Sequence, residues 1–423
     1  MRLPATFTLA LTLLASLSAT PKHSTLLREA GVALQAGDAA AALPKLEEAA
    51  QLRPDYPRLQ LLLARTYAAL ERPDDALAAL HRLADMDLRM NVAADPAFAA
   101  LKDTPAFSTV AQRLTRGPAP LASSDEAAFA ITDVTGIIES CLVDPATLEW
   151  YFGDVRNRCI WKRAVRTGTG QLQKFTADED ALDGVFKIAF SPDRKTLWAA
   201  TATVATMTGD DAEDGKRSAL VALDAATGRV VSRVPATTQG LKHLLGDFVI
   251  ADDGSIYASD SASPVVWRLA PGGTELEAWL QSDQFLNLQG LAFSADGDTL
   301  YVADYANGIW SVDVATKALS LLTAPANATF FGIDGLYAVP GGLLAVQNGI
   351  NPQRILRIEP SAGGPSSART VALGRPGMTD LALGQVFNGR FHFVGNSGWA
   401  LFDPAPASPP APRNVTILST ALE

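Results

Sequence analysis

Six segments of this chain repeat one pattern, and this repetition limits the possible fold more than any other feature. The segment LQGLAFSADGDTLYVADYANGIWSVD, residues 288–313, shows the pattern clearly. It contains three short apolar runs separated by the turns SADGD and YANG, in which Asp, Asn and Gly accept the backbone angles that tight turns need. Runs of this length with alternating apolar residues predict antiparallel strands. Each segment therefore predicts a small antiparallel sheet of three or four strands.

The six segments begin at corresponding residues, which allows the repeats to be counted. The spacings between successive starting residues are 47, 60, 43, 45 and 45, for Glu139, Phe186, Gly246, Gln289, Asp334 and Thr379. A unit of four strands repeated about every 45 residues is typical of a β-propeller. The sequence thus predicts an all-β six-bladed β-propeller over residues 127–423. Two stretches, AFAITD (128–133) and NVTILST (414–420), are both candidates for the outer strand of the last blade.

A different architecture precedes the propeller. Between residues 24 and 88, Ala and Leu recur at helical spacing in a pattern that returns after 34 residues. This period resembles the tetratricopeptide repeat, a pair of packed helices, with the turns expected at GDAAAAL (37–43) and ERPDDAL (71–77). A further helical segment at 95–114 would cover the last repeat. The predicted organisation is an all-α helical repeat domain, a linker and the propeller, at residues 21–114, 115–126 and 127–423.

The first twenty residues, MRLPATFTLALTLLASLSAT, have the layout of a secretory signal peptide, with one Arg, an apolar stretch and then small residues. We therefore predict that residues 1–20 are removed and that the protein is exported, either periplasmic or secreted. No later run reaches the roughly 18 apolar residues that a membrane helix needs, so we expect no membrane span in the mature chain. The net charge of −10 and the pI near 5.0 argue against a nucleic-acid partner, because no basic block is present to neutralise phosphates.

In a propeller the first strand of every blade lines the central channel, so the residues that begin the six segments are expected to meet around one axis. The ring contains the carboxylates of Glu139 and Asp334 and the amide of Gln289, while Asp247 and Asp380 each follow a ring position by one residue. Oxygen ligands without His or Cys favour Ca²⁺, Mg²⁺ or Mn²⁺. The pattern predicts a divalent-cation site. The alternative is that the same residues only end strands and hydrate the channel mouth.

Other polar residues near the channel have less specific patterns. His243 lies four residues before Asp247 and could serve as a base at the channel mouth, although a single His beside a blade entrance is more often a surface residue. The sequence contains no Gly-rich phosphate loop, nucleophile elbow or HExxH motif. Five further residues end second strands and are expected on the same face, where turn formation also explains them: Asp154, Asp260, Asp304, Asn348 and Asn396.

The propeller segments resemble the family of gluconolactonases, regucalcin and luciferin-regenerating enzymes, whose members are six-bladed propellers. The resemblance lies in IIESCLVDP of the first blade, LLGDFVIADDG of the third, LQGLAFSADGDTLYVAD of the fourth and FGIDGLYAVPGG of the fifth. It implies one bound divalent cation, with Ca²⁺ as the first candidate, held by Glu139, Gln289 and Asp334. Gln289 stands where the family has Asn, which keeps the amide oxygen but places it one methylene further from the backbone. Gly246 and Leu244 stand where the family's lactonases have a substrate-binding Asn and Arg, so the resemblance does not extend to a sugar lactone as substrate.

Two classes of function remain open from the sequence. In the first, the protein is a metal-dependent hydrolase of small lactones or esters, with the metal polarising the carbonyl group and Asp334, a ligand or neighbour of the metal, as the general base. Such an enzyme is expected to work without the helical repeats. In the second, the protein is a non-catalytic binding protein or scaffold, and residues 24–114 bind a protein or peptide partner.

The two cysteines are predicted to be free thiols, despite the expected export. Cys141 is expected on the first strand and Cys159 on the third strand of the same blade. Strands two positions apart in a sheet are separated by about 9.6 Å, which exceeds the roughly 7 Å between Cα atoms that a disulfide tolerates. Both side chains should therefore be buried and unpaired.

Overall fold

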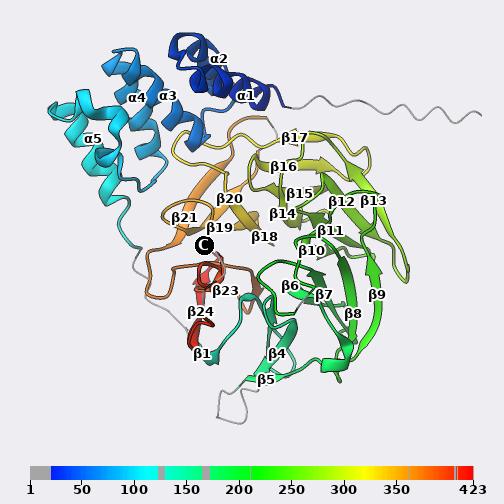
Figure 1. Cartoon of the computed structure of the whole chain (residues 1–423). Coiled ribbons are helices and arrows are strands. Elements are labelled where there is room, and N and C mark those ends of the chain that lie inside the picture. The colour runs from blue at the N-terminus through cyan, green and yellow to red at the C-terminus, as the bar shows by residue number, and fades with distance from the viewer. Residues whose placement is uncertain are drawn as a thin grey trace, which may run out of the picture.

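A computed structural model shows a helical domain followed by a six-bladed propeller (Figure 1). It describes residues 21–121, 129–163, 172–209, 211–361, 363–403, 406 and 408–422. The signal peptide expected at 1–20 and the end of the expected linker, 122–126, lie outside the described residues. Among the described helices, none is both long enough and apolar enough to cross a membrane. The predicted fold classes of the two parts are confirmed.

The N-terminal domain consists of paired helices, in which α1 packs on α2 and α3 on α4. Asp38 ends the first turn and caps α2, because its side chain accepts a hydrogen bond of 2.8 Å from the N–H of Ala41. Pro57 and Pro73 occupy the first positions of α3 and α4, where a missing N–H costs nothing. The helices, with two 3-10 turns, are α1 (Lys22–Gln35), α2 (Ala39–Leu52), α3 (Pro57–Ala69), α4 (Pro73–Asp85), η1 (Val92–Ala94), η2 (Pro96–Leu101) and α5 (Pro105–Arg116).

The first five blades are antiparallel sheets of four strands that follow one another in sequence order. Blade 1 has β2 (Ile138–Val143), β3 (Trp150–Asp154), β4 (Cys159–Arg163) and β5 (Leu172–Lys174), and blade 2 has β6 (Gly184–Phe190), β7 (Thr196–Ala202), β8 (Ser218–Asp224) and β9 (Val230–Pro235). Blade 3 has β10 (Leu245–Ile250), β11 (Ile256–Asp260), β12 (Val265–Leu269) and β13 (Leu276–Gln281). Blade 4 has β14 (Leu288–Phe293), β15 (Thr299–Asp304), β16 (Gly308–Asp313) and β17 (Leu319–Leu321), and blade 5 has β18 (Ile333–Val339), β19 (Gly342–Gln347), β20 (Arg354–Glu359) and β21 (Ser367–Leu373).

The sixth blade closes the propeller with strands from both ends of this region. Its order is β22 (Gly384–Phe387), β23 (Arg390–Val394), β24 (Arg413–Ala421) and β1 (Phe129–Val134). Both candidate stretches for the outer strand are therefore present in this sheet, with β24 third and β1 outermost. Phe129 pairs with Ile417, and this pairing ties the start of the propeller to its end. Two short 3-10 turns, η4 (Asp178–Asp180) and η5 (Trp399–Leu401), lie between strands.

Each pair of neighbouring blades encloses a hydrophobic cluster, because strand side chains alternate between the two faces of a sheet. Between blades 3 and 4, for example, Tyr257 and Trp279 pack with Leu291 and Val302. On β14, Leu291 is buried, whereas Gln289 and Phe293 are half-buried. The blades are thus held together by packing between successive sheets.

A repeated hydrogen bond fixes the end of the second strand in three blades. An Asp there accepts a bond from a Trp indole on the third strand, in the pairs Asp154 with Trp161 (2.8 Å), Asp260 with Trp267 (3.1 Å) and Asp304 with Trp310 (3.3 Å). The same carboxylates also accept backbone N–H groups from the loop before the first strand, at Ile137, Leu244 and Asn287. These three carboxylates are fully buried and hold loops, which is the turn role that the sequence left open for them.

In blade 5, Gln347 and Arg354 occupy the positions of the Asp–Trp pair. The helical domain contacts the propeller at this place. Arg354 is 1% exposed; its Nε donates to Gln347 Oε1 (2.7 Å) and its Nη1 donates to the carbonyl oxygen of Met86 (3.1 Å). The N–H of Arg89 donates to the carbonyl oxygen of Asn351 at 2.6 Å. Figure 1 shows the helices beside this part of the propeller. The two parts of the chain therefore share a buried polar interface.

The prediction for the cysteines is confirmed. Cys141 lies on β2 and Cys159 at the start of β4, and both are free and buried. Burial raises the pKa of the Cys141 thiol to about 12, because a thiolate there would lose its hydration.

Candidate functional site

The residues that begin five of the six repeated segments lie in β-bulges of the innermost strands. The pairing of the first two strands shifts register between Ile138 and Ser140 in blade 1 and between Ile333 and Gly335 in blade 5. Glu139 and Asp334 occupy these two irregular positions. A bulge re-aims the side chain that it contains, and Phe186, Gly246 and Gln289 lie in the corresponding bulges of blades 2, 3 and 4. The polar side chains of Glu139, Gln289 and Asp334 therefore point into the channel.

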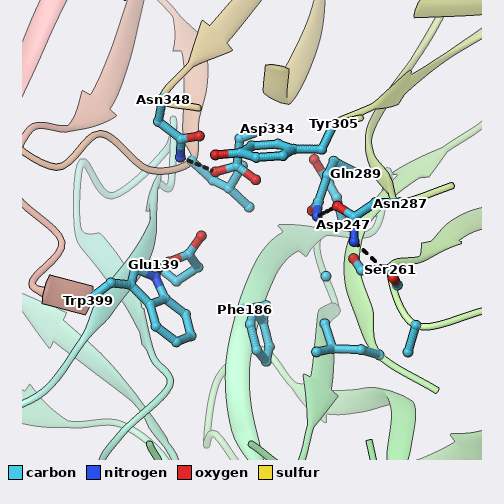
Figure 2. A pocket seen from close by; sticks show the side chains of 14 residues that line it. Glu139, Phe186, Asp247, Ser261, Asn287, Gln289, Tyr305, Asp334, Asn348 and Trp399 are labelled. Atoms are coloured by element: carbon cyan, nitrogen blue, oxygen red, sulfur yellow. Dashed lines mark hydrogen bonds between the residues drawn. The ribbon is translucent and has the colours of Figure 1, made fainter. Parts of the chain in front are cut away.

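A cavity of about 350 Å³ lies at this end of the channel. The structure brings Glu139, Asp247, Gln289 and Asp334 together on its wall (Figure 2). Its remaining lining residues are Phe186, Leu244, Gly246, Ser261, Ala262, Asn287, Tyr305, Asn348, Leu383 and Trp399. One part of the wall is therefore aromatic and aliphatic, and the other carries oxygen atoms.

Glu139 is buried and held by the sixth blade. Its Oε2 accepts a hydrogen bond of 2.5 Å from the indole Nε1 of Trp399, whose ring also lies 6.2 Å from that of Phe186. Burial raises the pKa of Glu139 well above its usual range, and repulsion from Asp334 adds to the effect. The protonated form of this carboxyl group is therefore favoured more than that of a free Glu, unless a positive charge binds beside it.

Asp334 faces Glu139 across the cavity (Figure 2). Its Oδ2 accepts a hydrogen bond of 2.8 Å from Asn348 Nδ2, which also donates to the carbonyl oxygen of Leu381 (2.9 Å). Burial, followed by repulsion from Asp247, raises the pKa of Asp334 to about 7. A carboxyl group with this pKa can exchange a proton near neutral pH, as a general base must.

Asp247, on the wall of this cavity, forms an ion pair with a buried lysine. Lys187 Nζ lies 3.1 Å from Asp247 Oδ1, and the side chains of both residues are buried. The N–H of Phe248 donates to the same Oδ1 at 2.6 Å. Asp247 lines this cavity, whereas Lys187 lines a second cavity of about 800 Å³ at the opposite end of the first strands. The ion pair thus lies between the two cavities.

Gln289 is oriented by the loop that precedes its strand. Its Nε2 donates to Asn287 Oδ1 (2.8 Å), and Asn287 Nδ2 donates to the carbonyl oxygen of Ser261 (3.0 Å). The amide nitrogen of Gln289 is therefore engaged by another residue of the cavity wall, and its Oε1 lies toward Gly246. The extra methylene of Gln relative to Asn is accommodated by this orientation.

Three of the sequence-predicted residues lie outside the cavity lining. His243 is buried, and its Nδ1 makes a 2.6 Å contact with Oδ2 of Asp260. Asp380 accepts hydrogen bonds from Ser397 Oγ (2.7 Å) and from the N–H of Trp399 (2.8 Å). Asp380 therefore fixes the loop from which Trp399 donates its hydrogen bond to Glu139. Thr379, which opens the sixth segment, is exposed and is also absent from the lining described above.

The sequence pattern did not assign several lining residues to the site, and three of them share one position. Ser261, Tyr305 and Asn348 each follow the last residue of a second strand, where the chain turns toward the channel. Asn348 was expected on this face, but only as one of the strand-ending residues that turn formation also explains. The position after the strand-ending Asp or Gln is the signal that would have found all three. Burial and the neighbouring carboxylates raise the pKa of Tyr305 beyond its usual range, so its hydroxyl group stays protonated.

The donor set fits a hard divalent cation. Two buried oxygen atoms of lining residues, Asp247 Oδ2 and Asn348 Oδ1, have no hydrogen-bond partner within the described part of the chain. Within that part, no three His, Cys, Asp or Glu side chains come close enough to hold a metal by themselves. Glu139 and Asp334 would therefore need amide oxygens, from Gln289 and Asn348, as further ligands. Carboxylate and amide oxygens are the ligands that Ca²⁺ and Mg²⁺ prefer.

Comparison with known proteins supports the helical part of the fold. The tetratricopeptide repeat family model matches residues 33–102, which confirms the helical repeats. No curated protein matches the chain.

Three solved structures illustrate the similarity of the propeller. A gluconolactonase from Xanthomonas campestris is 16% identical, with 70% of this chain and 90% of that chain covered and a TM-score of 0.48. The calcium-binding protein regucalcin from Agrobacterium tumefaciens is 12% identical, with 69% and 94% covered and a TM-score of 0.46. A luciferin-regenerating enzyme is 17% identical, with 69% and 95% covered and a TM-score of 0.46. At these identities the similarity concerns the fold.

Proposed function

We propose that this chain is an exported, divalent-cation-dependent hydrolase of lactones or esters small enough to enter the channel cavity. The observation that carries the proposal is the convergence of Glu139 and Asp334, two carboxyl groups with raised pKa values, on one cavity wall with amide oxygens beside them. Perturbed carboxyl groups that meet in a cavity are typical of functional sites. The signal-peptide pattern of residues 1–20 supports the proposed export.

The residues that would hold the cation are Glu139, Asp334 and the amide oxygens of Gln289 and Asn348. A bound divalent cation would supply Lewis-acid polarisation of a carbonyl group and favour ionisation of a water molecule. Trp399 fixes Glu139 by its hydrogen bond to Oε2, which leaves Oε1 toward the cavity. Ca²⁺ is the first candidate, with Mg²⁺ and Mn²⁺ as alternatives.

Asp334 is the proposed general base. The hydrogen bond from Asn348 engages its Oδ2 and fixes the plane of the carboxylate. Oδ1 would then accept a proton from an attacking water, and Oδ2 would remain as the oxygen available to the cation. The aromatic side chains of Phe186 and Trp399 would contact the apolar part of the substrate and exclude water from the reacting group.

The test combines cation binding with hydrolysis. Addition of Ca²⁺ at a hundred times its Kd should stabilise the protein by about 2.7 kcal/mol, which is visible as a rise of several degrees in Tm. A panel of small lactones and esters, with and without a chelator, then tests activity. Glu139→Gln and Asp334→Asn should abolish both responses.

The matched control is Asp252→Asn, which removes an exposed carboxylate at the opposite cavity. This variant should behave as the wild type. If the wild-type protein binds Ca²⁺ but hydrolyses nothing on a broad panel, it is a binding protein rather than an enzyme. If no divalent cation stabilises it, the carboxyl groups only hydrate the channel mouth.

A further inference from the structure

The helical domain touches the propeller at loops that carry cavity residues. Arg53, which ends α2, is 6% exposed and donates from Nη1 to Asn307 Oδ1 at 2.6 Å. Asn307 is fully buried and lies two residues after Tyr305, whose side chain lines the cavity. The N–H of Tyr305 donates to the carbonyl oxygen of Asn287, another lining residue, at 2.8 Å. One contact of the helical domain is therefore two residues from the cavity wall.

A second contact reaches the loop before Asp334. The ring of Tyr56, at the start of α3, stacks on the ring of Phe331 with centroids 4.0 Å apart and planes 7° from parallel. The guanidinium group of Arg53 also lies 4.5 Å from the centroid of Phe331. Phe331 precedes Asp334 by three residues, so this contact bears on the strand that carries the proposed base.

The two loops are also packed against each other without free space. Gly332 N–H donates to the carbonyl oxygen of Tyr305 at 2.9 Å, and Gly349 N–H donates to that of Gly332 at 3.0 Å. A Cβ atom on Gly349 would lie 2.6 Å from the Tyr305 hydroxyl and 2.6 Å from Gly332 Cα. Such close packing transmits displacement, since protein interiors are as dense as organic crystals. A shift of the Phe331–Gly332 backbone would therefore displace the Tyr305 ring.

Arg53 is itself held rigidly. Its Nε donates to Asp55 Oδ1 (3.0 Å) and its Nη2 donates to Asp55 Oδ2 (3.2 Å), in a two-point contact between buried side chains. Such a pair fixes the direction of the guanidinium group, because the planar fork matches the carboxylate. A buried ion pair adds little net stability compared with apolar residues of the same volume, but it can specify one arrangement.

We propose that the helical domain is a positioning element of the channel cavity, and that Arg53 and Tyr56 are its positioning residues. Their partner is the propeller of the same chain. They fix the Tyr305–Asn307 and Phe331–Asp334 segments and thereby the distance between Asp334 and the rest of the lining. This positioning role sets the shape of the cavity and is separate from the proposed hydrolysis. It also opposes the expectation, drawn from the sequence, that the propeller would work without the repeats.

The test uses the full chain with Arg53→Ala, Arg53→Lys and Tyr56→Ala, followed by amide hydrogen exchange. The expected result is an increase of about tenfold in exchange at Tyr305 and Gly332, whose N–H groups make the two loop hydrogen bonds, with no change at β7 in blade 2. Arg53→Lys keeps the positive charge but loses the two-point contact, so it should show a smaller change of the same kind. The control Arg113→Ala breaks an exposed ion pair with Asp85 in the helical domain and should change neither loop.

Calcium titration of the same variants adds a second readout. Arg53→Ala should weaken Ca²⁺ binding by about tenfold, because displaced ligands bind more weakly. Unchanged exchange at Tyr305 and Gly332 in both Arg53→Ala and Tyr56→Ala would overturn the proposal, as would an equal increase in blade 2 in all three variants. If the wild-type protein does not bind Ca²⁺, the proposed hydrolase fails, while the exchange rates still decide the role of the helical domain.

Discussion

The indole N–H of Trp399 donates a 2.5 Å hydrogen bond to Oε2 of Glu139, and this bond joins residues 260 positions apart in the chain. Trp399 begins η5 in the last blade, and Glu139 lies on β2, the innermost strand of the first. The bond therefore crosses the seam at which the propeller closes. It also satisfies one oxygen of a carboxyl group that burial removes from water.

Replacement of Trp399 by Phe should weaken Ca²⁺ binding by about tenfold at pH 7, the effect of losing a hydrogen bond to a charged group of about 1.5 kcal/mol. The indole N–H lowers the pKa of Glu139, so its loss makes the carboxyl group harder to ionise. Isothermal titration at pH 7 and pH 9 measures the effect, which should shrink at the higher pH. Trp198→Phe, in the hydrophobic cluster between blades 2 and 3, is the control. Equal affinities for Trp399→Phe and the wild type would contradict the assignment of Glu139 as a ligand.

Calcium affinity should rise between pH 6 and pH 8, because protons and cations compete for Asp334. The pKa of this group is raised to about 7 in the folded protein, above its usual value of 3.8. Without a cation, protonation of Asp334 therefore stabilises the folded state fully below about pH 4. This stabilisation is lost as the pH rises through 7. Tm measured with and without Ca²⁺ at both pH values tests this, and the calcium-induced rise should be larger at pH 8. Asp334→Asn should remove the difference, and a rise that is larger at pH 6 would be incompatible with it.

His23 should make the folded state less stable in acid. This residue is buried at the start of α1, and burial together with the positive charge of Arg53 lowers its pKa to about 4 from the usual 6.5. Because the folded state disfavours the charged imidazole, stability present above pH 6.5 is lost as the pH falls toward 4. Urea unfolding of His23→Gln from pH 7 to pH 4.5 should give a flatter pH profile than the wild type. The exposed His81, replaced in the same way, should leave the profile unchanged.

Arg354→Met should destabilise the protein by about 2 to 4 kcal/mol, because it leaves Gln347 and the Met86 carbonyl without their buried partner. The loss should appear as a lower midpoint in urea unfolding. Arg369→Met changes an exposed arginine on the neighbouring β21 and should have little effect. Equal midpoints for the two variants would show that the interface between the domains contributes nothing through this residue.

Neither cysteine should react with a thiol reagent in the folded protein. Burial raises the pKa values of Cys141 and Cys159, and only the thiolate is a good nucleophile. A colorimetric thiol assay should detect no thiol at pH 8 without denaturant and two thiols in concentrated urea. One thiol reacting rapidly in the native state would place that cysteine at the surface.

The local pattern was sufficient for most of the fold. The positions of Glu139, Gln289 and Asp334 at the start of their segments follow from repeat length and side-chain alternation, and the structure brings these three residues to one cavity. The same reasoning placed Asp380 and His243 near the channel mouth. In the structure, Asp380 accepts a hydrogen bond from the N–H of Trp399, and His243 contacts Asp260. The positions of these partners depend on the packing of neighbouring segments.

The sequence by itself determined the helical repeats, the six blades and the ring of residues at their bulges, because period and alternation are properties of neighbouring residues in the chain. Only the tertiary structure decided that Trp399 reaches Glu139, that β1 and β24 share the last blade, and that Arg53 and Tyr56 pack on Asn307 and Phe331. These contacts join residues more than 250 positions apart. They arise from closure of the propeller and docking of the helices, which depend on the shapes of whole surfaces rather than on any local pattern.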